Sequence, residues 1–214
     1  MVSKMLIDLH VHTKGLSPCS EMSPEEAALE AKKIGLDGIC FTEHNKPWDH
    51  HEILEVEEKS GILIFHGIEV DTTEGHVLVF GLQKNFEGIT PIEDLRQMVN
   101  EVNGFMIAAH PFRGFLLFGF SKLQMDVDDA SKNLLFKFVD CMEVFSGRQT
   151  IKENAFSSQV CERLNLKGVG GSDAHSIKDI GKCVTVFENR IERQEDLIRE
   201  LKTGRYKAGY FRKA

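Results

Sequence analysis

The sequence predicts an α/β fold in which strand–helix units close, or nearly close, into a barrel. Short apolar runs alternate with amphipathic helical patterns along the chain, and this alternation favours parallel strands joined by right-handed crossovers. About seven such units suggest a barrel, and an open doubly wound sheet is the main alternative. The 214 residues, 42% of them hydrophobic, suit a single domain over residues 1–214 with a well-buried core.

The predicted strands are short runs rich in apolar and β-branched residues. They cover residues 5–11, 38–42, 62–69, 76–82, 105–109, 139–145, 167–171 and 183–187.

The predicted helices begin at residues that cap helices and often end at glycines. Ser23-Pro24-Glu25-Glu26 combines a serine cap, a proline at the first helical position and a glutamate at the capping-box position, and Gly35 can end this helix. Thr90-Pro91-Ile92-Glu93 repeats the pattern before Gly104. The other predicted helices cover residues 49–61, 128–138, 151–164 and 194–203.

Composition excludes several classes of protein. The formal charge of −7 argues against tight, non-specific nucleic-acid binding. No apolar run reaches the ~20 residues of a membrane-spanning helix, and residues 1–7 do not form a signal peptide. The five cysteines are odd in number and lack C-x-x-C spacing, which indicates reduced thiols. We therefore expect a cytoplasmic protein without membrane or nucleic-acid partners, and the oligomeric state stays open.

The first predicted strand ends in a pair of histidines, His10 and His12, separated by one residue. Side chains at positions i and i+2 of a strand point the same way. Both imidazoles can therefore reach one metal ion from a single strand end. Two surface histidines would give the same pattern, but the apolar strand before them and the adjacent Asp8 favour a site.

Other predicted strands also end or begin in histidine, aspartate or glutamate. Taken singly, each of these residues could be a helix cap or a core polar group; taken together, they predict one metal site at the mouth of a barrel. Mixed imidazole and carboxylate ligands suit zinc, manganese or iron better than calcium. The residues are His44, Glu69, His76, His110, Asp173 and His175, whereas His50, His51 and His66 do not fit the pattern.

In these residues the sequence resembles the PHP (polymerase and histidinol phosphatase) domain family. The resemblance implies a distorted (β/α)7 TIM-like barrel that holds two or three divalent transition metals and hydrolyses phosphoesters. The matching stretches occur in the family's order and span residues 8 to 175. They are Asp8-Leu9-His10-Val11-His12-Thr13, Thr42-Glu43-His44-Asn45, Gly67-Ile68-Glu69, Ala109-His110-Pro111 and Gly171-Ser172-Asp173-Ala174-His175.

The resemblance also implies the ligand sets. The third set departs from the family pattern, because Ser17 and Pro18 stand where many members have an aspartate or histidine. Cys19 or Glu21 could substitute, and Glu43 replaces a more usual aspartate. The implied sets are His10, His12, Glu69 and Asp173 for the first metal; Glu69, His110 and His76 for the second; and His44 and His175 for the third.

Two metals close together suit phosphoester hydrolysis, because they allow a bridging hydroxide near neutral pH and neutralise charge in the transition state. Arg113, three residues after His110, and Arg148, after the 139–145 strand, are the candidate phosphate ligands. Lys14 ranks below them, since a guanidinium can bind phosphate through two parallel hydrogen bonds. The expected substrate is a small phosphorylated metabolite or nucleotide.

Two other function classes stay open: a non-phosphate, amidohydrolase-like metal hydrolase and a non-catalytic metal-binding module. The sequence lacks a convincing barrel lysine of the amidohydrolase kind, and the complete first two ligand sets argue against loss of the site. An apolar segment, Phe112 to Phe120, follows His110. Core packing or a subunit interface is our interpretation of that segment.

Overall fold

The computed structural model describes residues 4–114 and 126–212. Its strands form one sheet of nine, in the order β7-β6-β5-β4-β3-β2-β1-β8-β9. Their bounds are β1 Met5–Val11, β2 Gly38–His44, β3 Leu63–Thr72, β4 Gly75–Phe80, β5 Phe105–Ala108, β6 Cys141–Ser146, β7 Lys167–Gly171, β8 Cys183–Phe187 and β9 Tyr206–Tyr210.

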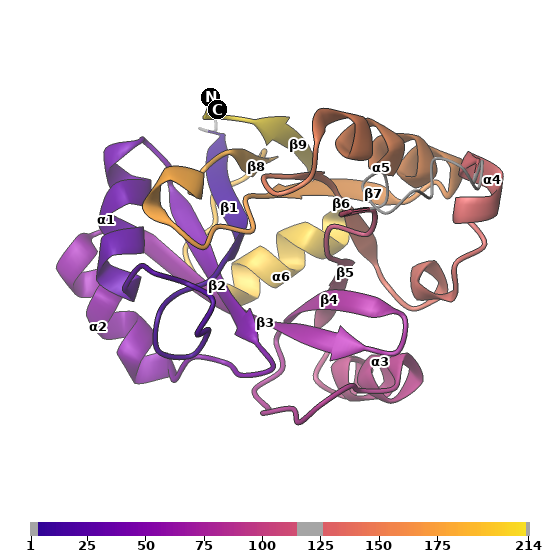
Figure 1. Cartoon of the computed structure of the whole chain (residues 1–214). Helices are drawn as coiled ribbons and strands as arrows, with labels where there is room; N and C mark the ends of the chain where they lie inside the picture. Colours follow the sequence, from indigo (N-terminus) through magenta and orange to yellow (C-terminus); the bar gives the residue numbers. More distant parts are fainter. Residues whose placement is uncertain (1–3, 115–125, 213–214) are drawn as a thin grey trace.

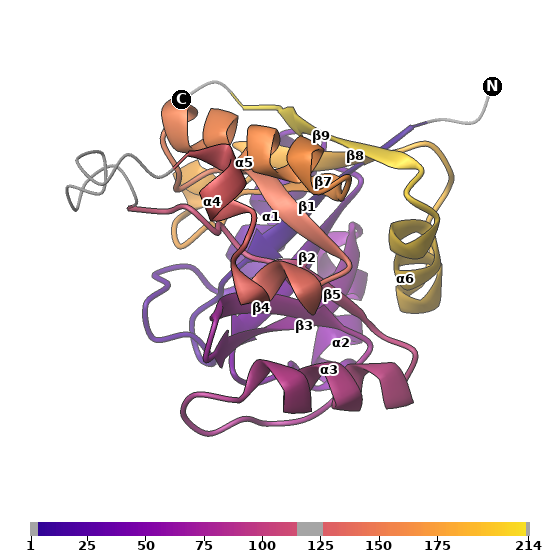
Figure 2. The same ribbon diagram turned by 90° about the vertical axis from the view of Figure 1, so that its right-hand side faces the viewer.

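Helices lie between most of these strands. In Figure 1, α1 and α2 pack together on one side of the sheet, and in Figure 2, α3 and α5 lie at opposite ends of its curve. The helical bounds are α1 Pro24–Lys33, α2 His50–Ser60, α3 Ile92–Glu101, α4 Val127–Ala130, α5 Ile151–Arg163 and α6 Gln194–Thr203, with 3-10 turns η2 Leu134–Lys137 and η3 Ile177–Asp179.

The sheet is mixed, so the predicted parallel pairing is correct for only part of it. The pairs β1–β2, β2–β3, β5–β6 and β6–β7 are parallel. The strand β4 runs antiparallel to both β3 and β5, and β8 runs antiparallel to both β1 and β9. Only a two-residue turn separates β3 from β4, and so short a connection permits a hairpin but no crossover.

The sheet curls until its two halves nearly meet, which confirms the predicted barrel. Directly after β7, Ala174 forms a parallel bridge with Val11, and its carbonyl accepts a hydrogen bond from the His12 N–H at 2.9 Å. The Thr185 hydroxyl of β8 donates to the Gly170 carbonyl of β7, also at 2.9 Å. The closure joins the end of β7 to the end of β1, and thereby brings residues far apart in the sequence to one place.

The capping predictions succeed where the side chain reaches the first helical turn. Ser23 and Glu26 form the predicted capping box of α1, and Gly61 ends α2 in the left-handed conformation. The prediction of a cap at Thr90 is wrong: α3 starts after Pro91 without a side-chain cap. The Thr90 N–H instead donates to the Asp71 carbonyl at 2.8 Å, because this segment pairs with the end of β3.

Two other segments differ from the predictions. Residues 128–138 form a short helix and a 3-10 turn rather than one helix, and the sequence patterns did not indicate β9. Phe112 is buried and packs edge-on against Phe156 at 4.8 Å between ring centroids, as expected for core. The rest of the apolar segment, Phe115 to Phe120, lies outside the described residues.

The apolar core consists of three clusters that line the strands and the inner faces of the helices. None of the helices among the described residues has the length and apolar character needed to cross a lipid bilayer. Polar residues, not members of these clusters, lie at the open edge of the barrel, and they form the candidate site.

Candidate metal centre

The carboxyl ends of the parallel strands lie at one edge of the barrel, and the predicted ligands gather there. The pleat of β1 points both of its histidines the same way, as the H-x-H spacing predicts. From β1, β2, β3 and the turns that follow β5 and β7 come His10, His12, His44, Glu69, His110, Asp173 and His175.

His76 reaches the same edge from the start of its strand rather than the end. It is the second residue of β4, which runs antiparallel to β3. An antiparallel neighbour places its amino end beside the carboxyl end of its partner. The reversed direction of β4 thus explains why His76 opens a strand while the other histidines close theirs.

The described residues include three groups whose ligand atoms lie within 4.8 Å of one another. His10 belongs to two of these groups, and so does His12, so the groups form one connected cluster. They are His10, His12 and Asp173; His10, Glu69 and His110; and His12, His44 and His175.

Glu69 lies at the centre of the cluster, and its two oxygens face different histidines. Oε1 lies 2.9 Å from His110 Nε2 and 2.9 Å from His76 Nδ1. Oε2 lies 3.2 Å from His12 Nε2 and 3.1 Å from His44 Nδ1. A carboxylate with this division of contacts can bind one cation through each oxygen.

His76 contacts Glu69 but stands outside the three groups. Its Nδ1 faces Glu69, and its Nε2 lies 3.4 Å from an oxygen of Asp71. The structure therefore places this implied ligand of the second metal beside the cluster, with two carboxylates as its neighbours.

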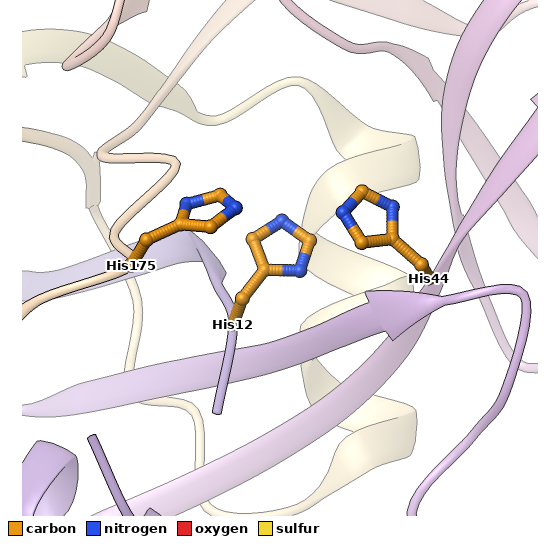
Figure 3. Close-up of side chains that lie close together, drawn as sticks. All are labelled: His12, His44 and His175. Atoms are coloured by element: carbon orange, nitrogen blue, oxygen red, sulfur yellow. The ribbon is translucent and has the colours of Figure 1, made fainter. Parts of the chain in front are cut away.

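The implied third set, His44 and His175, gains His12 in the structure. Figure 3 shows the three rings in a row with His12 between the other two. Its ring centroid lies 4.5 Å from each neighbour. The buried Ser17 hydroxyl lies 3.3 Å from His12 Nδ1 and accepts a hydrogen bond from the His44 N–H. Ser17 thus holds two histidines in place, at a position where many family members carry a ligand.

Two of the ligands stand on strained backbone. His110 has φ 27° and Asp173 has φ 51°, in a region that residues with a side chain rarely adopt. Each lies two residues after the last residue of a strand. Strain of this kind persists where surrounding contacts hold it, and it concentrates at functional sites.

The charges of the buried carboxylates are balanced by imidazoles. Burial raises the pKa of Glu69, but His10, His110 and His12 outweigh burial and hold that pKa well below its usual range. The pKa of Asp173 is lowered in the same way against burial, chiefly by His10 and His12. Burial lowers the pKa of His10, yet Glu143, Asp173 and Glu69 raise it well above the usual value.

The accessible histidines behave differently. Burial lowers the pKa of both His44 and His175, so both imidazoles are neutral near pH 7 and offer lone pairs. The pKa of His76 is raised, first by its hydrogen bond to Glu69.

The residues of the cluster fit divalent transition metals. The donor set mixes imidazole nitrogens with carboxylate oxygens, as zinc, manganese and iron prefer. Asp173 Oδ1 is buried and has no hydrogen-bond partner, although it lies 3.3 Å from His12 Nε2 and 3.6 Å from His10 Nε2. An orphaned carboxylate oxygen beside two imidazoles is a ligand position for a cation.

The three basic side chains that the sequence analysis proposed as phosphate ligands lie in different places. Arg113 lies at the cluster, where its Nη1 donates to Asp173 Oδ2 at 2.6 Å. Arg148 is exposed and lines a hollow of about 660 Å³ that also includes Cys19, His175 and Lys178. Lys14 is exposed on the loop after β1. The structure thus brings one arginine into contact with a ligand and leaves the second at the rim.

A smaller hollow of about 230 Å³ lies on the other side of the cluster. Its walls include His76, His110 and Arg113. The two hollows therefore reach the cluster from the His175 side and from the His110 side, and each contains an arginine.

Sequence reasoning missed Glu143, which is fully buried on β6. One of its oxygens lies 3.0 Å from His10 Nδ1, and the other accepts a hydrogen bond from the His110 N–H at 2.7 Å. An acidic residue inside a buried strand was the available signal, because a buried charge needs a partner. The outlying histidines were placed correctly: His50 and His51 are exposed, and His66 contacts Gln83 away from the cluster.

Several known proteins are similar to this chain in sequence or in fold. An uncharacterized protein of Methanocaldococcus jannaschii is 31% identical over 118 residues, which cover 50% of this chain and 68% of that protein. A probable phosphatase of Thermoanaerobacter is 26% identical over 234 aligned residues, which cover 95% of this chain and 94% of that protein.

Among solved structures, a two-domain protein from Bacteroides vulgatus, described as containing a predicted PHP-like metal-dependent phosphoesterase, superimposes with a TM-score of 0.74. It is 21% identical, and the match covers 98% of this chain and 66% of that chain, so a third of the longer protein has no counterpart here. The family model of the PHP domain matches residues 8–134, more than half of the chain, and a PHP-associated model matches residues 152–206. The chain therefore belongs to the PHP domain family.

Proposed function

We propose that this protein hydrolyses a phosphoester bond in a small phosphorylated metabolite or nucleotide, with two or three divalent transition metals as cofactors. The observation that carries the proposal is the connected cluster in which three ligand groups share His10 and His12 around the Glu69 carboxylate. Ligand groups that share residues hold cations close together, and closely spaced cations suit phosphoester hydrolysis because they activate water and neutralise charge in the transition state.

Each protein group has a distinct task in this reaction. His10, His12, Asp173 and Glu69 would hold one cation, Glu69 and His110 a second, and the accessible His44 and His175 would complete the third group with His12. When bound, the metals supply Lewis acidity that activates water and neutralises phosphate charge.

The arginines orient the substrate in this proposal. Arg113 contacts Asp173 and can turn toward a phosphate bound at the cluster, since its side chain is 37% exposed. Arg148 lines the larger hollow beside His175, where it can pair with an anionic part of the substrate. Both guanidinium groups can present two parallel hydrogen bonds to a phosphate. Lys14 would contribute only long-range attraction from its exposed loop.

Size and charge support a small substrate. The two hollows, about 660 Å³ and 230 Å³, suit a metabolite or nucleotide rather than a macromolecule. The net charge of −7 disfavours nucleic-acid duplexes. The cysteines are free thiols, which supports a reducing compartment such as the cytoplasm. The description of one relative as a probable phosphatase agrees with this activity.

The proposal is tested with protein stripped by chelator and reloaded separately with Mn²⁺, Zn²⁺ or Fe²⁺. Each form is assayed against phosphomonoesters, phosphodiesters and a panel of amides. Metal-dependent hydrolysis, seen as phosphate released from a monoester or alcohol released from a diester, lost after chelation and restored on reloading, is the expected result. Turnover of amides alone would identify an amidohydrolase-like enzyme instead. Stoichiometric metal binding without turnover of any substrate would identify a binding module.

A further inference from the structure

Glu143 occupies a position that none of the metal-ligand groups explains. It lies in the middle of β6, and its carboxylate is fully buried. A buried charge is costly unless each oxygen has a partner. Its two partners are His10 on β1 and the backbone of His110 in the turn after β5; both belong to the group with Glu69, and His10 also belongs to the group with His12 and Asp173.

The contact with His10 decides which ring nitrogen faces the metals. Glu143 Oε1 lies 3.0 Å from His10 Nδ1, and a carboxylate can only accept a hydrogen bond there. In the neutral ring that can bind a metal, the proton of His10 is therefore held on Nδ1. The Nε2 atom, whose lone pair a metal would take, lies on the side of Glu69 Oε2 at 3.5 Å and Asp173 Oδ1 at 3.6 Å.

The contact with His110 fixes the strained turn after β5. Glu143 Oε2 accepts the His110 N–H at 2.7 Å, at a residue whose φ is 27°. With the backbone held in this way, His110 Nε2 lies 2.9 Å from Glu69 Oε1. One carboxylate thus orients two histidines that approach Glu69 from opposite oxygens.

Gly171 on β7 provides the space for this arrangement. A methyl group at position 171 would lie 2.6 Å from Glu143 Oε1 and 2.6 Å from His10 Cβ. A Cβ atom essentially never lies so close to a non-bonded atom, so any side chain at position 171 would displace Glu143 or His10. The glycine, the carboxylate and the two histidines form a matched set contributed by four strands or the turns directly after them.

We infer that Glu143 is a positioning residue that couples two of the ligand groups: it sets the Nδ1–H form of His10 and the backbone conformation of His110 together. It touches neither metal nor substrate, and acts only through these two ligands. The inference rests on the proposed metal-dependent function, but it concerns metal binding and not the identity of the substrate.

Replacing Glu143 by glutamine tests the inference sharply, because an amide cannot satisfy both partners. A carboxylate accepts through both oxygens, whereas an amide has one oxygen and one NH₂ donor. If the amide oxygen keeps the His110 N–H, the NH₂ group faces His10 Nδ1 and favours the ring form with its proton on Nε2. That proton occupies the lone pair that a metal needs.

The experiment compares wild type with Glu143→Gln, Glu143→Asp and the control Glu153→Gln. Glu153 is also buried, but it contacts Thr150 at the start of α5. Mn²⁺ and Zn²⁺ affinities are measured by calorimetry on stripped protein, and the His10 Nδ1–H is observed by ¹⁵N NMR of the Zn²⁺-loaded protein. Far-UV circular dichroism confirms that each variant is folded.

We expect Glu143→Gln to weaken binding of at least two metals about 10- to 100-fold, the usual effect of losing a partner behind a ligand, and to abolish the His10 Nδ1–H signal. Glu143→Asp, which keeps the charge but cannot span both contacts, should retain part of the affinity, and Glu153→Gln all of it. Wild-type metal affinity and an intact His10 Nδ1–H signal in Glu143→Gln would overturn the inference. Equal losses of metal affinity in Glu143→Gln and Glu153→Gln would also overturn it. If Glu143→Gln does not fold, the partial affinity of Glu143→Asp decides. These readouts need no substrate, so a failure of the proposed phosphoesterase activity would be seen separately.

Discussion

Replacing Glu69 by glutamine is the most demanding test of the metal centre, because one residue is expected to serve two cations. The substitution keeps the size of the side chain but removes its charge and leaves one good acceptor oxygen. In the structure, Oε1 faces His110 and His76 at 2.9 Å, while Oε2 faces His12 and His44 at 3.2 and 3.1 Å. The change therefore affects both sides of the cluster.

The size of the effect follows from the two-sided contact. Loss of one charge-assisted interaction costs about 1.5–3 kcal/mol, so each of two cations should bind about 10- to 150-fold more weakly. Because both act on the same phosphate, the two losses add to about 3–6 kcal/mol, or about 10²- to 10⁴-fold in turnover. The apolar clusters do not include Glu69, so the metal-free protein should melt within a few degrees of wild type.

The assay combines elemental analysis after dialysis at graded metal concentrations, calorimetric titration with Mn²⁺, and hydrolysis of the best phosphoester found. His44→Ala is the matched comparison, since His44 faces only one of the two Glu69 oxygens. It should lower the metal content by at most one ion per chain. If Glu69→Gln binds two metals tightly and turns over near the wild-type rate, Glu69 does not bridge two cations and the site assignment is wrong.

Further predictions concern the surroundings of the cluster. Arg113→Ala and Arg148→Ala should each remove about 1.5–3 kcal/mol of transition-state stabilisation, measured as a lower kcat/KM at unchanged metal content. Wild-type kinetics in both variants would show that neither arginine binds the phosphate. Gly171→Ala should cost about 1–3 kcal/mol of stability through overpacking and weaken metal binding, because the methyl group meets Glu143 and His10; calorimetric melting with and without Zn²⁺ measures both effects. Ser23→Ala should remove the α1 cap, lower stability by about 1 kcal/mol and lower Tm by about 2–4 °C. Thermal melting measures this loss, and an unchanged Tm in Ser23→Ala would contradict the stabilising role of the cap.

Features that depend on neighbouring residues were predictable from the sequence. The pairing of His10 and His12 on one face follows from the two-residue period of a strand, and the structure keeps it. The capping box of Ser23 and the glycine stop at Gly61 depend on hydrogen bonds within one turn, and both are present. The recurrence of ligands at strand ends was visible for the same reason, since it needs only the position of each strand along the chain.

Features that depend on which segments meet in space required the tertiary structure. The short connection before His76 permits only a hairpin, but it needed the structure to show that the reversed strand brings its first residues to the mouth of the barrel. The third ligand group includes His12 because β1, β2 and the turn after β7 converge, and Ser17 contacts two of its members. The contacts of Glu143 also required the tertiary structure, because both of its partners come from distant parts of the chain. Local hydrogen bonding and strand periodicity depend on residues close together in the sequence. A shared metal centre depends on the closing of the sheet, which brings five or more strands to one edge.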